Sequence, residues 1–232
     1  TVENKTLDDQ VLIKRDGMPT YNFANVVDDH LMGITHVVRG SEYLSSAPKY
    51  NLLYQGFGWE IPTYVHCSPV MRDAQNKMSK RHGDPSYEDL KAQGYLTEAI
   101  LNYVALLGWS PRGELAEQEI FDLKGLVDAF DLGGVSKSPA IFDIDKLTHF
   151  NALYLRAMTP EQFLAVAEPY IKQGCKNCDP AIIAPLLQAR CEKLTEIPEK
   201  VDFFDQLPDY DIGLFNNKKS KCNPDVAQEM LS

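Results

Sequence analysis

Apolar positions alternate between strand-like and helix-like spacing over the first part of this chain. Residues 11–13 form a short apolar run and residues 16–19 have the composition of a tight turn, so we expect a hairpin leading into Tyr21. From Asn22 onward the apolar residues follow helical spacing, and Gly33 is a candidate C-cap.

A second alternation follows. Residues 36–38 and 64–67 are expected to be extended, and the helix between them should start after Ser45 or Ser46 and stop around residues 56–58. Strands separated by helices are the signature of an α/β layer with parallel strands.

Beyond Pro85 the strand signals almost vanish and helix signals follow one another. The start at Thr159 is the clearest, because a proline occupies the first helical position and Gln162 completes a capping box. Pro185 should bend the last predicted helix, which we expect to reach Leu194. The expected helices begin after Thr97, Asp122, Asp143, Thr159 and Asp179. The fold class is therefore α/β followed by mainly α.

Composition places the chain among globular proteins. Hydrophobic residues make up 44% and charged residues 24%, and no apolar run approaches the roughly 20 residues of a membrane span. The polar start shows no secretory signal, so we expect a cytoplasmic protein with no membrane partner. A net charge of −10 argues against nonspecific coating of nucleic acid, although it does not forbid a local basic groove.

The cysteines give no regular disulfide framework. They form an odd set of five, which favours reduced thiols over disulfides. Cys175 and Cys178 make the only CxxC, and zinc would need two further ligands that no second CxxC or HxxxH pair supplies. We therefore expect no structural zinc and no other metal site.

The string Lys-Met-Ser-Lys-Arg at residues 77–81 carries the clearest chemistry. Two lysines three positions apart can hold a triphosphate, and a carboxylate that attacks the α-phosphorus of ATP expels pyrophosphate, whose charge needs nearby cations. For an isolated string, a solvated basic loop would be the preferred interpretation.

The wider sequence context favours the ATP interpretation. Strings at residues 16–30, 33–42, 77–81 and 142–151, in that order, resemble bacterial-type glutamyl-tRNA synthetases, which are class I aminoacyl-tRNA synthetases, over essentially the whole chain. The resemblance implies the second half of a class I nucleotide-binding fold, then a stem-contact region and a helical bundle.

The implied domains are residues 1–72, the later half of the catalytic fold; 73–157, the stem-contact region with the lysine string; and 158–232, part of the first anticodon-binding helical domain. The HIGH-type signature of the family does not occur in the chain. We therefore expect an internal fragment that is inactive by itself.

The resemblance assigns glutamate recognition to four residues. Arg39 can hold the substrate's side-chain carboxylate with both arms of its guanidinium, and it ends a predicted strand, where open α/β sheets present ligand sites. An ion pair with Glu42 is the structural alternative. Tyr21 and Asn25 can present a hydroxyl and an amide to the same ligand, although a buried hydrogen-bonded pair is a fair alternative, and Tyr43 matches a more variable pocket position.

The lysine string is expected to be catalytic. Lys80 is the first choice for stabilising the leaving pyrophosphate, Lys77 and Arg81 assist, and Ser79 shapes the loop.

We expect the adenine of ATP to bind at the residues just before that string. By resemblance, Val70 and Met71 cradle adenine with their backbone. Other polar residues of the first part are expected to serve packing or the surface: Asp28, Asp29, His30 and His66.

These assignments predict a glutamate–tRNA ligase as the parent protein. It would form glutamyl-adenylate from L-glutamate and Mg-ATP and transfer the glutamyl group to the 3′-terminal adenosine of tRNA(Glu), and we expect a monomer. One rival is a glutamyl-queuosine tRNA(Asp) synthetase-like paralogue, which lacks the helical extension. The other rival is a noncatalytic tRNA-binding module.

Overall fold

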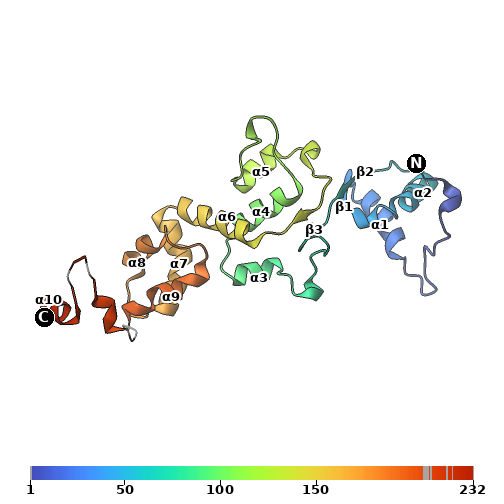
Figure 1. Ribbon diagram of the computed structural model, residues 1–232. Coiled ribbons are helices and arrows are strands. Elements are labelled where there is room, and N and C mark those ends of the chain that lie inside the picture. Colours follow the sequence, from blue (N-terminus) through green and yellow to red (C-terminus); the bar gives the residue numbers. More distant parts are fainter. Residues whose placement is uncertain (1, 206–208, 210, 218, 221, 232) are drawn as a thin grey trace. The chain divides into compact units, whose positions relative to one another are not determined.

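The computed structural model describes residues 2–205, 209, 211–217, 219–220 and 222–231. The chain divides into two compact units (Figure 1). The first comprises Thr1–Ser86 and Ile100–Ile144, and the second comprises Tyr87–Ala99 and Asp145–Ser232. Each unit therefore joins segments that are far apart in the sequence.

The first unit opens with the expected α/β layer. Its strands β1 and β2 pair in parallel, starting with His36 opposite Thr63. The helices α1 and α2 bury Val26, Tyr50 and Tyr54 in a small core. The elements of this layer are α1 (Tyr21–Leu31), β1 (His36–Gly40), α2 (Ala47–Phe57) and β2 (Thr63–Cys67).

The expected hairpin forms only as an antiparallel bridge between Ile13 and Pro19, with Gly17 at φ 84° in its turn.

Glycines mark the ends of both helices of this layer. Gly33 follows α1 and Gly58 follows α2, each with φ 68°, a left-handed conformation that costs glycine little.

The rest of the first unit holds a second parallel pair of strands. These strands, β3 and β4, pair Val70 with Ala140, 70 residues further along the chain, and nothing in the apolar pattern beyond Pro85 predicted β4. A strand of two residues carries no measurable alternation, so the pattern that predicted mainly helices could not reveal it. The elements are β3 (Val70–Met71), α4 (Thr97–Gly108, from Ile100 onward in this unit), α5 (Leu123–Ala129) and β4 (Ala140–Ile141).

The second unit is helical, as expected. The capping box at Thr159 is confirmed, because its side chain accepts from the backbone of Gln162 and the Gln162 side chain accepts in return. In Figure 1, α8 and α9 lie beside α7, and side chains from all three helices fill the core around Phe163, Ala167 and Ile171. The elements are α3 (Tyr87–Ala92), α6 (Ile144–Ala157), α7 (Pro160–Gly174), α8 (Pro180–Leu187), α9 (Ile197–Val201) and α10 (Pro224–Leu231).

The helix expected to reach Leu194 ends earlier. α8 stops at Leu187, and the chain then turns before α9 begins. Cys191 and Leu194 are nevertheless buried in the same core. Their apolar spacing therefore reflects packing of a turn and not a continuous helix.

The expectation of reduced thiols was wrong for one pair of cysteines. Cys175 and Cys178 form a disulfide just after α7, where the turn brings their Cα atoms to 5.6 Å, a spacing that suits a disulfide. Asp205 lies beside this turn, with a carboxylate oxygen 3.4 Å from the Cys175 sulfur. The turn thus adds a third potential metal ligand that sequence spacing did not reveal, but sulfurs joined to each other are not thiolate ligands, and we assign no metal.

Short 3-10 helices connect the longer elements. They are η1 (Asn4–Thr6), η2 (Ser41–Tyr43), η3 (Lys80–His82), η4 (Gly113–Leu115), η5 (Leu132–Gly134), η6 (Leu194–Glu196), η7 (Asp202–Phe204) and η8 (Ile212–Phe215). Among the residues described, no helix combines the length and the apolar character needed to cross a membrane.

Candidate active site

Arg39 lies at the carboxyl end of β1 and is surrounded by tyrosine rings. Its Nη2 donates to the hydroxyl oxygen of Tyr21 at 2.8 Å, and its guanidinium carbon lies 3.7 Å from the ring centre of Tyr43 and 5.4 Å from that of Tyr50. Burial alone would lower the pKa of Arg39, but the surrounding tyrosine hydroxyls raise it overall. Arg39 therefore remains a cation held by aromatic faces.

One arm of this cation has no partner in the part of the chain that the structure describes. Nη1 of Arg39 is buried and makes no hydrogen bond there. The alternative partner, Glu42, instead accepts a hydrogen bond from Lys77 at 3.2 Å. A buried and unsatisfied guanidinium arm is costly, and a carboxylate ligand would satisfy it.

The remaining glutamate candidates lie on the elements around Arg39. Tyr43 belongs to η2, and Tyr21 and Asn25 lie one turn apart on α1, which places them on one face of that helix. Asn22 was not singled out in the sequence, yet it accepts a hydrogen bond from the Tyr50 hydroxyl at 3.0 Å and so holds one of the rings around the guanidinium. The distance in sequence between Asn22 and Tyr50 gave no indication that the two side chains are in contact.

The lysine string follows a tight hairpin. The backbone N–H of Met78 donates to the carbonyl of Val70 at 3.1 Å, and Met71 forms an antiparallel bridge with Lys77. Asp73 closes the turn by accepting from the backbone N–H groups of residues 75 and 76. The hairpin therefore fixes where the string begins.

Lys80 and Arg81 lie on η3, immediately after this hairpin. Ser79 caps η3, because its hydroxyl accepts from the N–H of Arg81 at 3.3 Å. The side chains of Lys80 and Arg81 are exposed. Ser79 therefore fixes the start of η3 through this hydrogen bond, while Lys80 and Arg81 on η3 remain exposed to solvent.

Asp84 links the middle of the string to Arg72 in the hairpin. Its Oδ2 accepts from the backbone N–H of Ser79 at 2.7 Å and from Nη2 of Arg72 at 3.0 Å, and its Oδ1 lies 2.9 Å from Nε of Arg72. The Ser79 N–H, followed by Arg72, lowers the pKa of Asp84. The sequence positions of Asp84 and Arg72 did not indicate that the two side chains pair, because the pairing depends on how the hairpin folds.

A hollow of about 560 Å³ adjoins the string. Three of its lining side chains, Arg72, Lys77 and His82, carry or can carry positive charge. A polyanion such as a triphosphate matches this lining better than an apolar ligand would.

Arg39 and the lysine string lie on the same unit, with Glu42 between them. Glu42 is bonded to Lys77 and follows Arg39 by three residues. The pKa of Glu42 is lowered first by a backbone hydrogen bond and then by Lys77, and the charge of Arg39 contributes as well. Glu42 therefore pairs with the first lysine of the string and feels the charge of Arg39.

Val70 and Met71 form β3. Their carbonyl oxygens already accept hydrogen bonds, from Met78 at 3.1 Å and from Phe142 at 2.8 Å. An adenine at this strand would therefore contact backbone groups that the hairpin and β4 hold in place.

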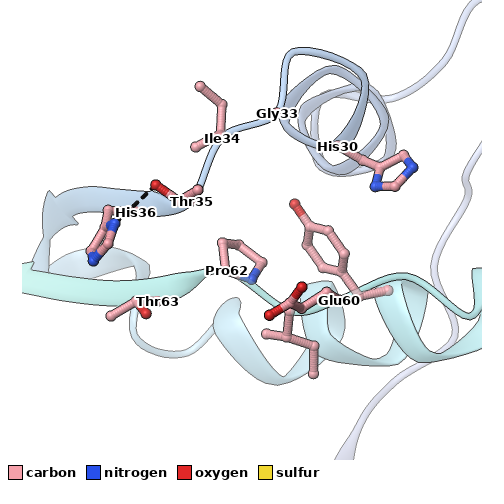
Figure 2. A pocket seen from close by; sticks show the side chains of 10 residues that line it. His30, Gly33, Ile34, Thr35, His36, Glu60, Pro62 and Thr63 are labelled. Atoms are coloured by element: carbon pink, nitrogen blue, oxygen red, sulfur yellow. Dashed lines mark hydrogen bonds between the residues drawn. The ribbon is translucent and has the colours of Figure 1, made fainter.

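A second hollow lies at the other end of the strands. It has a volume of about 450 Å³ and is lined by residues that include His30, Glu60 and Thr63 (Figure 2). Thr35 and His36, which are hydrogen-bonded to each other, lie at the amino end of β1. Open α/β sheets bind ligands at the carboxyl ends of their strands, so this hollow is not the candidate active site.

Two of the histidines of the first part lie against aromatic rings. His30 stacks on Trp59 with ring centres 3.8 Å apart, and His66 lies parallel to Tyr64 at 6.3 Å. The buried Nδ1 of His66 has no hydrogen-bond partner among the described residues. Burial raises the pKa of Asp29 on α1.

Comparison with protein families gives two matches that together cover almost the whole chain. Residues 1–149 match the family described as tRNA synthetases class I (E and Q), catalytic domain. Residues 154–232 match the family described as anticodon binding domain.

Curated relatives carry the name glutamate–tRNA ligase. The protein of Clostridium tetani is 56% identical over 232 residues, and that of Clostridium acetobutylicum is 54% identical over 233 residues; each match covers 100% of this chain and 47% of the relative. The chain thus spans about half the length of these relatives.

Solved structures agree. A glutamate tRNA ligase from Elizabethkingia meningosepticum, solved in complex with its amino acid, is 35% identical with a TM-score of 0.83, and the match covers 99% of this chain and 49% of that one. A glutamate-tRNA synthetase from Elizabethkingia anophelis gives 36% identity and a TM-score of 0.79 over 95% of this chain and 47% of that one.

Proposed function

This chain belongs to the class I tRNA synthetases of the E and Q group, and we propose that it is part of a glutamate–tRNA ligase. The observation that supports the proposal is the buried Arg39 Nη1, which has no hydrogen-bond partner among the described residues, three residues before a glutamate that pairs with Lys77 of the lysine string. The names of the relatives support the same activity.

Arg39 selects the amino acid. Its Nη1, which has no hydrogen-bond partner among the described residues, offers a donor to the side-chain carboxylate of glutamate, and Tyr21 and Tyr43 contact the same guanidinium. We assign Asn25, one turn after Tyr21 on α1, to the same ligand. Glutamine presents a neutral amide of the same shape, so its binding would leave the guanidinium without a counter-charge. The pocket therefore prefers glutamate.

The lysine loop serves ATP, which enters as its magnesium complex. An oxygen of the glutamate α-carboxylate attacks the α-phosphorus, a new O–P bond forms, and the bond to the pyrophosphate oxygen breaks. Lys80 stabilises the charge that grows on pyrophosphate, with Lys77 and Arg81 assisting. Val70 and Met71 hold adenine through their backbone. In the second step the terminal adenosine hydroxyl of tRNA(Glu) attacks the acyl carbon and AMP leaves.

The second unit supports tRNA as the partner. Residues 154–232 match an anticodon-binding family, and a glutamyl-queuosine tRNA(Asp) synthetase-like paralogue would lack that extension. We therefore favour tRNA(Glu) over that rival. The division into catalytic residues 1–72, stem-contact residues 73–157 and anticodon-binding residues 158–232, the monomeric state and the cytoplasmic location belong to the same proposal.

ATP–pyrophosphate exchange by the full-length protein tests this proposal. With tRNA(Glu) present, glutamate should support exchange and glutamine should not. A noncatalytic tRNA-binding module, the remaining rival, would bind tRNA in a gel shift but exchange nothing with either amino acid, and that result would refute the proposal.

A further inference from the structure

The cationic side chains of the lysine string do little to hold it in place. Lys80 and Arg81 are exposed on η3, a helix of three residues, and Lys77 pairs with the exposed Glu42. Surface ion pairs of this kind contribute little to holding a loop in place. The hairpin fixes Met78 and the Ser79 hydroxyl caps η3, so any further support must act on the backbone between them.

Asp84 supplies that support. Its side chain is only 12% exposed, and one carboxylate oxygen receives both the Ser79 N–H and the Arg72 guanidinium. Arg72 follows β3 directly, and its own N–H donates to the carbonyl of Asn76 at 2.8 Å. The residue that pairs with Asp84 is therefore part of a hydrogen-bonded hairpin. A two-pronged bond between guanidinium and carboxylate fixes direction as well as distance.

We propose that Asp84 is a positioning residue, which acts through Ser79 and Arg72 to hold the lysine string where pyrophosphate leaves. The proposal rests on the proposed function and adds two residues to it. Arg72 has a second task, because it neutralises a carboxylate that would otherwise repel the triphosphate from the hollow that Arg72, Lys77 and Ser79 line.

Exchange kinetics of the full-length protein, with tRNA(Glu) present, test the proposal. Asp84→Asn keeps the shape but loses the charge, and we expect kcat to fall about tenfold or more, since the charge-assisted bonds that position the lysine string are weakened. KM for glutamate should stay unchanged, because the Arg39 pocket is untouched. Asp84→Glu should recover part of kcat.

We call the bonds of Asp84 to Arg72 and to the Ser79 N–H the clamp. A double-mutant cycle tests whether Asp84 and Arg72 act together in this clamp or independently. Arg72→Gln leaves a bare carboxylate beside the phosphates, so it should lose at least as much kcat as Asp84→Asn. The double variant should lose no more than Arg72→Gln alone. Losses that multiply across the two sites would overturn the proposal.

Asp122→Asn is the matched control. Asp122 also accepts a backbone N–H, from Gly125 at 2.6 Å at the start of α5, and this bond involves no residue of the lysine string. It should keep kcat near wild type. An equal loss in Asp122→Asn, a wild-type kcat in Asp84→Asn, or a loss explained by a smaller fraction of active sites would each overturn the proposal.

Hydrogen exchange distinguishes failure of the clamp from failure of the proposed function. If the wild-type protein exchanges no pyrophosphate, the proposed ligase activity fails, and the clamp is judged by deuterium uptake in this chain. Asp84→Asn should then speed uptake at residues 78–82 while Asp122→Asn does not. Equal uptake in Asp84→Asn and wild type would overturn the clamp.

Discussion

The proposed site uses two kinds of cation. Arg39 is a fixed cation, enclosed by rings and missing one hydrogen-bond partner among the described residues. Lys80 is exposed on a short helix, where it can follow charge as the charge moves. The first arrangement suits recognition of a ground state, and the second suits a transition state.

At this scale we predict that Lys80→Ala in the full-length protein slows ATP–pyrophosphate exchange by about 100-fold or more, because a cation that stabilises the leaving group is lost. KM for glutamate should change little. The measurement is steady-state exchange at varied glutamate. An exchange rate equal to that of the wild type would remove Lys80 from the mechanism.

Glu42 permits a milder prediction. Its ion pair with Lys77 joins side chains that are 52% and 55% exposed, so we expect Glu42→Gln to leave the stability of the chain almost unchanged. Freeing Lys77 should lower KM for ATP slightly, by less than about threefold, since a weak surface pair competes with the phosphates. A several-fold rise in KM for ATP would instead show that Glu42 helps to hold Lys77 for the nucleotide.

At the scale of elements, the capping signal of α7 gave a reliable prediction, whereas the pairing of β3 with β4 gave no local signal. α7 was predictable because Thr159, Pro160 and Gln162 lie within one turn of each other. β4 was not, because two residues become a strand only through pairing with β3 far along the chain. The end of α8 was misplaced because Leu194 is buried by packing and not by helical periodicity.

The capping box offers a stability test. Thr159→Ala should lower the free energy of unfolding of the second unit by about 1 kcal/mol, because the N–H of Gln162 loses its acceptor. Urea unfolding of the chain, followed by circular dichroism, measures this. Thr6→Ala, at an exposed threonine of the first unit, serves as the control, and equal midpoints for Thr159→Ala and wild type would contradict the assignment.

Asp205 makes the second unit sensitive to acid. The backbone N–H of Lys176, and then Asn177, lower the pKa of Asp205. A carboxyl group with a lowered folded pKa adds stability above its unfolded pKa of about 3.9, and that stability is lost as the pH falls through the folded value. Asp205→Asn should therefore flatten the decline of the unfolding midpoint below about pH 4. Parallel pH profiles for the two proteins would contradict this.

At the scale of the whole molecule, the family and its reaction were accessible from the sequence, but the support of the site was not. The strings that resemble glutamyl-tRNA synthetases are contiguous, so Arg39 and the lysine string were visible at once. Asp84 and Arg72 meet only because a hairpin folds back, and Asn22 meets Tyr50 only across two helices. The bond between Cys175 and Cys178 likewise depends on the turn after α7.

The length of the relatives gives a prediction for the isolated chain. Since this chain corresponds to 47% of the Clostridium tetani protein, we predict that the 232 residues alone catalyse no ATP–pyrophosphate exchange, while the full-length protein does. Parallel exchange assays at equal concentration measure the difference. Comparable activity in both would show that the chain already contains a complete catalytic site.

The central claim is that Arg39 reads the side-chain carboxylate of glutamate, and kcat/KM for glutamate in ATP–pyrophosphate exchange by the full-length Arg39→Met protein tests it most directly. We expect a fall of about 100-fold or more, with loss of the preference over glutamine. Arg112→Met, at an exposed arginine of the same unit, should match the wild type. An unchanged kcat/KM for glutamate in Arg39→Met would contradict the account.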